Sequence, residues 1–263
     1  MGQVRGRWAA RRVGGAGRRA GAWVLAGAGF LGAMVVAQVV SGLRPEPIRL
    51  TSVVVVLLAA SAVAFAVGRD GSRAVGAFCA AVGIGYAAEW IGVRTGVPFG
   101  TYSYTSLLRP QPGGVPVIVA VAWGGMGLAA HAVATAIVPE SGPRRWAAGA
   151  LALTAWDLFL DPQMLRLGLW TWADGGPYRG VPISNFAGWL AVSLLVMAAI
   201  DMIVGRAERI PSGGLVAIYG VMAVMETVAF SAVFEPPDRV VAAFGGTAMG
   251  AFAVLAWRRR WPR

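Results

Sequence analysis

Long apolar stretches separated by short polar segments make up most of this 263-residue chain. A hydrocarbon core about 30 Å thick requires roughly 20 apolar residues for each helix that crosses it. Eight stretches are predicted to be such spans: residues 22–43, 51–68, 74–93, 115–138, 146–162, 186–204, 213–234 and 240–257. The sequence therefore predicts an all-α, polytopic transmembrane helix bundle, with residues 22–257 forming a single domain. An Arg-rich segment, 1–21, precedes this domain, and a short basic tail, 258–263, follows it.

The composition supports a membrane protein over a soluble one. Only 13% of the residues are charged, whereas about a quarter are charged in a typical soluble domain. The net charge of +11 could suggest a nucleic-acid-binding protein, but the basic residues, all of them arginines, lie between apolar runs. We therefore expect a lipid bilayer, and no nucleic acid, as the surroundings of this chain.

The arginines also predict the orientation, because cytoplasmic segments of membrane proteins are rich in Arg and Lys. With the N-terminus inside a prokaryotic plasma membrane, seven of the 23 arginines fall on the outer side, namely Arg44, Arg49, Arg94, Arg109, Arg166, Arg179 and Arg239. The other sixteen fall inside, so both termini are predicted to be cytoplasmic. A cleavable signal peptide is the alternative interpretation of the first span, and it is disfavoured because no clear cleavage site follows.

Five of the twelve acidic residues fall within the predicted spans: Glu89, Asp157, Asp161, Asp201 and Glu226. An ionised carboxylate at the bilayer centre costs at least about 2.5–3.5 kcal/mol, so such residues are candidates for function. Glu89, Asp157 and Asp161 lie toward the outer ends of their spans, and we favour a functional role for them. Asp201 is interpreted as an interfacial residue near Arg206 and Arg209. Glu226 is as compatible with a helix-to-helix hydrogen bond as with function.

Aromatic and amide residues gather at the level of these outer acids. Helical spacing predicts that Tyr86, Glu89 and Trp90 share one face. Trp156 adjoins Asp157, Trp123 lies in the outer half of its span, and Asn185 shares a face with Trp189. Trp170 and Trp172 are interpreted as interfacial belt residues, and His131 as a hydrogen-bonded core histidine.

The single cysteine, Cys79, and the single histidine limit the possible chemistry. They exclude an intramolecular disulfide framework, a Cys/His zinc site and an iron–sulfur cluster. We expect no metal and no cofactor, so any catalysis must use carboxyl, amide, phenol, indole and guanidinium groups.

The middle of the chain carries a specific pattern of motifs. It includes Gly85-Tyr-Ala-Ala-Glu89-Trp, Ala155-Trp-Asp157-Leu-Phe-Leu-Asp161-Pro, Trp170-Thr-Trp172 and Val181-Pro-Ile-Ser-Asn185-Phe. This pattern, over about two fifths of the chain, resembles the integral-membrane carotenoid-biosynthesis family that includes the bisanhydrobacterioruberin hydratases and the carotenoid 1′,2′-hydratases. The resemblance implies addition of water to the terminal double bond of an acyclic carotenoid, which gives a tertiary alcohol. Other carotenoid-biosynthesis enzymes are candidate partners.

The residues present suit such a reaction, which needs a proton donor, a stabilised carbocation and a positioned water. A carboxyl group in an apolar site can stay protonated and act as a general acid. We hypothesise that Asp157 or Glu89 protonates the alkene, and that Asp161 and Asn185 position the water. Indole faces can stabilise the cation. The predicted substrate-binding residues are Tyr86, Trp90, Trp123, Trp156, Trp189 and Glu226.

Two other functions remain open from the sequence. An intramembrane prenyltransferase would bind magnesium diphosphate through two aspartate-rich motifs, of which Asp157-x-x-x-Asp161 could be one. A transporter or a scaffold for pigment enzymes is the non-enzymatic alternative, although no inverted repeat of the kind common in transporters is evident.

Overall fold

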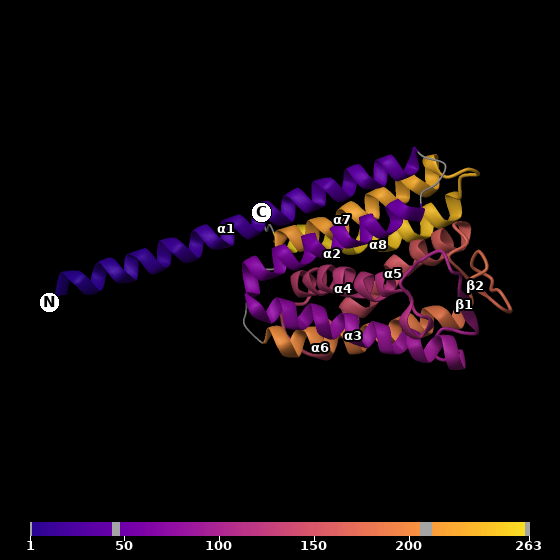
Figure 1. Cartoon of the computed structure of the whole chain (residues 1–263), viewed down its shortest axis with the longest axis horizontal. Coiled ribbons are helices and arrows are strands. Elements are labelled where there is room, and N and C mark those ends of the chain that lie inside the picture. Colours follow the sequence, from indigo (N-terminus) through magenta and orange to yellow (C-terminus); the bar gives the residue numbers. More distant parts are fainter. Residues whose placement is uncertain (1, 44–47, 206–211, 261–263) are drawn as a thin grey trace.

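The computed structural model describes residues 2–43, 48–205 and 212–260, with side chains for 20–43, 50–205 and 212–259. Eight α-helices make up most of the described chain: α1 (Gly2–Gly42), α2 (Ile48–Asp70), α3 (Ser72–Thr95), α4 (Val117–Ile137), α5 (Pro143–Arg166), α6 (Ile183–Val204), α7 (Gly213–Val228) and α8 (Arg239–Arg260). The predicted all-α bundle is confirmed, and the helices lie nearly side by side along one axis (Figure 1).

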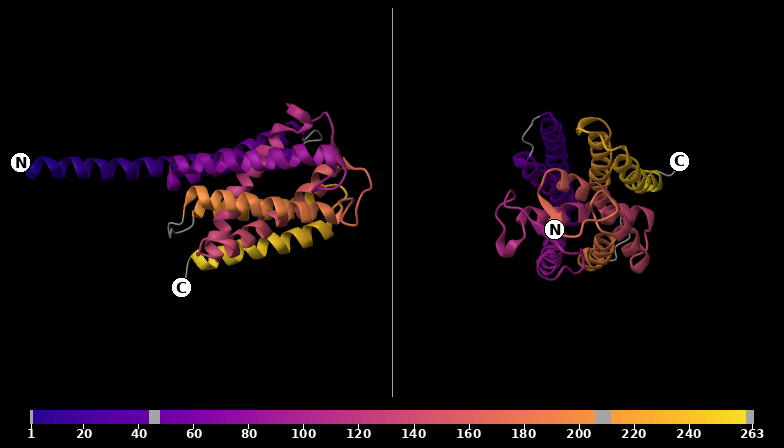
Figure 2. Two further views of the ribbon diagram at one scale, coloured as in Figure 1. Left: turned by 90° about the horizontal axis from the view of Figure 1, so that it is seen from below. Right: turned by 90° about the vertical axis from the view of Figure 1, so that its right-hand side faces the viewer.

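The centre of the bundle is α4, which is buried almost continuously from Ala120 to Ala136. Six helices surround it in the order α2, α3, α6, α5, α8 and α7, and each packs against α4 and against its two neighbours. Glycines of α4 allow this close approach, because a Cβ at Gly124 would meet Phe78 of α3 and one at Gly127 would meet Val196 of α6. The remaining helix, α1, lies outside this ring against α2 and α7 and extends beyond the bundle (Figure 2).

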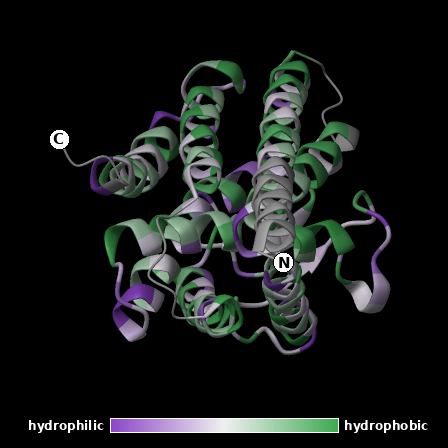
Figure 3. Cartoon of the chain, turned by 90° about the vertical axis from the view of Figure 1, so that its left-hand side faces the viewer, coloured by the Kyte–Doolittle hydropathy of each residue, from purple (hydrophilic) through white to green (hydrophobic). Residues whose placement is uncertain are grey.

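Seven of the eight helices are long and apolar enough to cross a membrane, judged by length and composition over the described residues. The exception is α5, which is 24 residues long but carries arginines at both ends and two aspartates on its buried face. Its side chains Arg145, Asp157 and Asp161 are buried in the bundle, whereas large apolar side chains of α6 such as Leu195 and Met202 are exposed on the outside. Apolar residues occur along the helices all around the bundle (Figure 3).

The long segments that follow α3 and α5 meet at one end of the bundle. They contain β1 (Tyr102–Tyr104) and β2 (Trp170–Trp172), which pair antiparallel with Tyr102 opposite Trp172 and Tyr104 opposite Trp170. We call this the sheet end, and it lies far from the C-terminal end of α8 (Figure 1). The predicted orientation would place the sheet end outside the cell, and that orientation stays a prediction.

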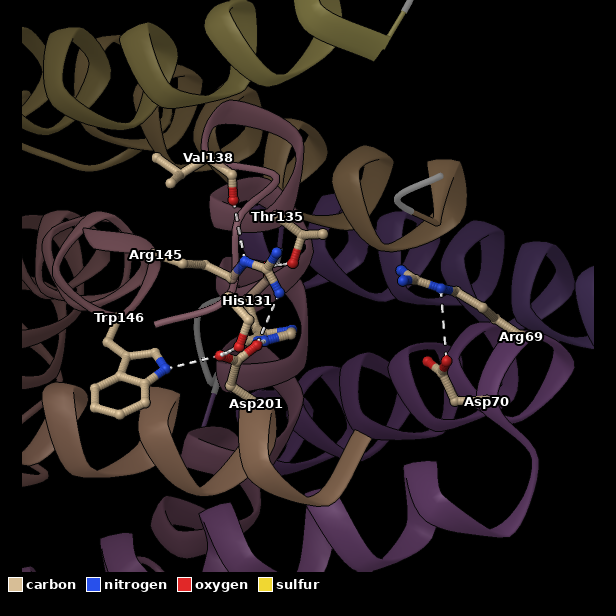
Figure 4. Close-up of polar contacts among 9 residues, drawn as sticks. Arg69, Asp70, His131, Thr135, Val138, Arg145, Trp146 and Asp201 are labelled. Atoms are coloured by element: carbon tan, nitrogen blue, oxygen red, sulfur yellow. Dashed lines mark hydrogen bonds and ion pairs between the residues drawn. The ribbon is translucent and has the colours of Figure 1, made fainter. Parts of the chain in front are cut away.

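A buried polar network lies at the opposite end of the bundle (Figure 4). The Asp201 carboxylate of α6 accepts hydrogen bonds from Arg145 (Nη1, 2.9 Å), Ser141 (Oγ, 2.6 Å) and Trp146 (Nε1, 2.8 Å), and His131 Nε2 lies 3.2 Å away. These donors come from α4, α5 and the loop between them, so one carboxylate ties three helices together.

This network corrects one interpretation from the sequence and supports another. Asp201 is 3% exposed and pairs with Arg145, so it is not an interfacial side chain. The arginines expected beside it, Arg206 and Arg209, lie outside the described residues. His131 is a hydrogen-bonded core histidine, as predicted.

Candidate active site

Glu89 lies on the buried face of α3, which repeats as Ala81, Gly85 and Glu89 at intervals of four residues. Three donors converge on its carboxyl group. Tyr102 and Tyr104 donate from their hydroxyls to Oε2 at 2.5 and 2.7 Å, and Trp123 of α4 donates from Nε1 to Oε1 at 3.2 Å. Both oxygens of Glu89 are therefore occupied, and a proton on either oxygen would compete with one of these bonds.

The alternation of side chains along a strand explains how β1 supplies two of these donors. Tyr102 and Tyr104 are two residues apart, so both side chains point to the same face, toward α3. They also contact each other edge to face, with ring centroids 5.5 Å apart. Burial raises the pKa of both tyrosines, and the nearby charge of Glu89 raises it further. Both hydroxyls therefore remain protonated donors.

Asp157 and Asp161 form a second carboxyl pair on α5. They are one helical turn apart and both are buried, Asp157 completely. The side-chain amide of Asn185, from α6, donates to Oδ2 of each aspartate, at 2.8 Å in the case of Asp157. Trp170 of β2 donates from Nε1 to Asp161 Oδ1 at 3.1 Å. The one amide therefore fixes the two carboxyl groups relative to each other.

Stacked indoles connect the two groups of acids. The ring of Trp189 stacks on Trp123, with centroids 4.0 Å apart, and meets Trp156 edge to face at 6.1 Å. Trp123 is bonded to Glu89, and Trp156 precedes Asp157 on α5. We call Glu89, Asp157, Asp161 and Asn185, with their donors Tyr102, Tyr104, Trp123 and Trp170, the carboxyl cluster. Its acids come from α3 and α5, as the sequence analysis anticipated.

An apolar pocket borders the cluster at the sheet end. Its aromatic half consists of Trp123, Trp156, Trp170 and Trp189. Trp123 and Trp170 line the pocket and turn their ring nitrogens to Glu89 and Asp161, so these two indoles connect the pocket with those two carboxyl groups. An apolar molecule in this pocket would lie next to indole rings that are hydrogen-bonded to acids. Over the described residues, no three His, Cys, Asp or Glu side chains converge in a way that could hold a metal ion.

Three of the residues predicted for this site lie elsewhere. Trp90 is 42% exposed and stacks under Arg94, and the Tyr86 hydroxyl donates to the carbonyl of Pro112. The buried face of α3 is therefore rotated from the one expected, since Glu89 points inward while Tyr86 and Trp90 do not. Glu226 is buried on α7, where its Oε2 has no hydrogen-bond partner among the described residues.

The sequence analysis missed three donors of the cluster: Tyr102, Tyr104 and Trp170. Trp170 was interpreted as an interfacial belt residue, but it is buried and bonded to Asp161, so that interpretation was wrong. A usable signal was present. The patterns Tyr-x-Tyr and Trp-x-Trp place two aromatic side chains on one face of a short strand.

Comparisons with known proteins found one matching family and one similar curated protein. The profile of a family described as "Carotenoid biosynthesis protein" matches residues 51–253, a range that contains the whole carboxyl cluster. A protein named bisanhydrobacterioruberin hydratase, from Haloarcula japonica, is 30% identical over 126 residues. That match covers 46% of this chain and 43% of the hydratase, so the two align over less than half of either length. No solved structure matches the chain.

Proposed function

Because the chain belongs to the carotenoid biosynthesis protein family, we propose that it hydrates an acyclic carotenoid. In the proposed reaction, water adds to the terminal double bond of an acyclic end group and gives a tertiary alcohol. The name of the Haloarcula japonica relative supports hydration as the reaction type. The apolar pocket beside buried carboxyl groups supports an apolar substrate that reacts by proton transfer.

The hydrogen bonds to the three acids of the cluster indicate which of them is the proton donor. Among the three acids of the cluster, Glu89 and Asp161 have hydrogen-bond donors on both oxygens, whereas Asp157 Oδ1 has none among the described residues. Asp157 and Asp161 are also held close together, because the Asn185 amide donates to both of them. Two neighbouring buried carboxyl groups do not readily ionise together. We therefore assign the proton to Asp157, on Oδ1, the oxygen that accepts no hydrogen bond among the described residues.

The proposed reaction begins with transfer of this proton to the alkene. The proton moves from Asp157 Oδ1 to the CH carbon of the terminal double bond, and the π electrons form the new C–H bond. The positive charge then resides on the dimethyl-substituted carbon as a tertiary carbocation. The faces of Trp156 and Trp189 stabilise this cation, an effect worth about 2 kcal/mol when the site is free of water.

Water completes the reaction. Its oxygen forms a bond to the cationic carbon, and its extra proton passes to the Asp157 carboxylate, which restores the acid. Asp161 and Asn185 hold the water on the side of Asp157. Glu89 has a different role, because its two oxygens already accept three hydrogen bonds. In its ionised form it would stabilise the carbocation through the indole wall.

Expression in a host that accumulates an acyclic carotene tests this proposal. The wild-type protein should convert the pigment into a product one water heavier, detected by chromatography and mass spectrometry. Asp157→Asn should abolish the conversion, since an amide cannot donate the proton. Asp174→Asn, the same change at an exposed loop position, should leave the conversion intact. Unchanged pigment with a correctly folded wild-type protein would refute hydration, and full activity of Asp157→Asn would refute the assigned donor.

The same assay separates the alternatives left open by the sequence. A prenyltransferase would require magnesium and a prenyl diphosphate, and its product would be heavier by a prenyl unit. A transporter or scaffold would leave the pigment's mass unchanged in every variant.

A further inference from the structure

The apolar pocket also has an aliphatic part, which was not predicted from the sequence. Besides its tryptophans, the pocket is lined by residues that include Thr51, Val55, Leu108, Ile118, Leu160 and Met164. Thr51 and Val55 belong to α2, a helix that contributes nothing to the carboxyl cluster. The two spans that precede α3 carry no motif of the family pattern quoted above, so nothing in the sequence marked α2 as part of a binding site.

The position of α2 explains why the pocket forms there. In the ring around α4, α2 and α5 are not neighbours, since α3 and α6 separate them on one side and α7 and α8 on the other. The pocket bridges this distance at the sheet end, where it is lined by Thr51 and Val55 of α2, Ile118 of α4 and Leu160 of α5. A molecule that occupied it would contact indoles at one side and α2 at the other.

The chemistry of the lining specifies the occupant. Among the described residues, no charged side chain lines the pocket, and Thr51 is the only lining residue with a hydroxyl group. A diphosphate, a sugar or an ionic head group would find no partner, whereas a branched hydrocarbon chain would bury apolar surface throughout. The aromatic half adjoins the acids, so the reacting end of such a chain belongs there. The part of the chain that follows the reacting end belongs in the aliphatic half.

We propose that Thr51, Val55, Leu108 and Ile118 form a binding site for the isoprenoid chain behind the reacting end group, and that α2 thereby selects the substrate. This inference rests on the proposed function, because the substrate class is the one proposed above. It concerns recognition and not catalysis, so α2 acts by shape and without touching the reacting atoms.

Two neighbouring valines on α2 provide a matched test. Val55 lines the pocket, whereas Val56, the next residue, is 53% exposed on the outer surface of the helix. Purified protein in detergent would be titrated with lycopene, a fully acyclic carotene, and binding would be followed by quenching of tryptophan fluorescence. Four of the tryptophans line the pocket, so a bound polyene should quench them efficiently.

Val55→Phe should fill the aliphatic half and weaken lycopene binding at least tenfold, while Val56→Phe should bind as the wild type does. Equal binding by Val55→Phe and the wild type would overturn the proposal. If the wild type binds lycopene in this Val55-dependent way but produces no hydrated pigment, the proposed binding site is supported and the proposed hydration is refuted. If the protein hydrates lycopene and both phenylalanine variants do so equally, the reaction stands and the pocket assignment fails.

A smaller substitution covers the case in which Val55→Phe does not fold. Val55→Ala removes two methyl groups from the pocket wall and adds no bulk. It should weaken lycopene binding by threefold or more, because the chain behind the end group loses apolar contact with the pocket wall, whereas Val56→Ala should bind as the wild type does. Equal lycopene binding by a folded Val55→Ala protein and the wild type would contradict a role for α2 in substrate recognition.

Discussion

At the scale of single residues, the three acids of the carboxyl cluster differ in what surrounds them and not in their chemistry. Glu89 is held by two phenols and an indole, and Asp161 by an amide and an indole. Asp157 has one oxygen without a donor. The proposed assignment of Asp157 as the proton donor rests on this difference, because each oxygen of Glu89 and Asp161 already accepts a hydrogen bond.

The tyrosines of β1 should make stability depend on pH above the neutral range. Burial raises the pKa of Tyr102 and Tyr104 above the ordinary value of about 10. Above that pH the unfolded chain releases protons that the folded protein retains, so folding stability should fall as the pH rises from about 10. Thermal unfolding followed from pH 8 to 11 should show a falling Tm.

The control for this prediction removes the titrating groups. In the double variant Tyr102→Phe/Tyr104→Phe the Tm should depend less on pH above 10, whereas Tyr86→Phe, which changes a tyrosine outside the cluster, should behave as the wild type. Parallel pH profiles for the wild type and the double variant would show that these hydroxyls do not titrate as expected.

Gly85 provides a test of the Glu89 environment without changing any member of the cluster. A Cβ at Gly85 would overlap the Trp123 ring, while one at Gly83, on the same helix, would meet nothing. Gly85→Ala should displace Trp123 from Glu89. The loss of one hydrogen bond to a charged group, about 1.5 kcal/mol, corresponds to a hydration rate roughly tenfold lower.

Gly83→Ala is the matched control, because it adds the same methyl group to the same helix in open space. Rates should be compared per amount of folded protein. Equal rates for the two alanine variants would mean that the bond from Trp123 to Glu89 does not contribute to the reaction.

At the scale of elements, different hydrogen-bond networks hold the helices together at the two ends of the bundle. At the sheet end, β1 and β2 bring donors from two long loops onto acids of α3 and α5. At the opposite end, Asp201 of α6 binds donors from α4, α5 and their connecting loop. The first arrangement leaves one carboxyl oxygen without a donor, and the second saturates its carboxylate. This contrast separates a candidate catalytic site from a structural network.

Asp201→Asn should therefore destabilise the fold without acting on the reaction. It leaves the buried guanidinium of Arg145 without its charge partner, which typically costs about 3–5 kcal/mol. For a chain of this size, such a loss lowers the Tm by roughly 6 °C or more. Thermal unfolding in detergent would measure it.

Glu140→Gln removes the same charge from an exposed position near this end and should leave the Tm unchanged. The folded fraction of Asp201→Asn should retain the hydration rate of the wild type. A Tm equal to that of the wild type would show that the network contributes no stability.

At the scale of the whole molecule, α4 organises the bundle, because six helices pack around it and it contributes Trp123 to the site. The site lies at the sheet end, within the apolar slab that the outer helices define. An apolar substrate dissolved in the membrane can therefore approach at the level where the acids lie. The predicted orientation places this level in the outer leaflet.

Cysteine labelling tests that orientation. In a Cys79→Ala background, Asp174→Cys introduces a thiol at the sheet end, and Glu140→Cys introduces one at the opposite end. A membrane-impermeant maleimide should label Asp174→Cys in intact cells, and Glu140→Cys only after permeabilisation. The reverse pattern would place both termini outside.

Much of the site was predictable from the sequence, because carboxyl groups in apolar spans are costly wherever the spans pack. Glu89, Asp157 and Asp161 were proposed on this basis, and Asn185 was proposed because it shares a helix face with Trp189. The prediction that Trp90 lies in the site together with Glu89 was wrong. Adjacent residues of a helix point about 100° apart, and packing decides which of them faces inward. Trp170 was missed because its hydrogen bond to Asp161 forms only when the loop after α5 folds back onto the bundle.

The sequence by itself determined the helix bundle, because the length and apolarity of each span are local properties. They decide whether a segment is stable as a helix in a bilayer. It also determined that several acids must be buried, because they lie within those spans. Only the tertiary structure decided which donors meet which acid, and that α2 lines the pocket. Those contacts depend on the rotation and spacing of helices far apart in the sequence, and these are set by side-chain packing around α4 and not by any one segment.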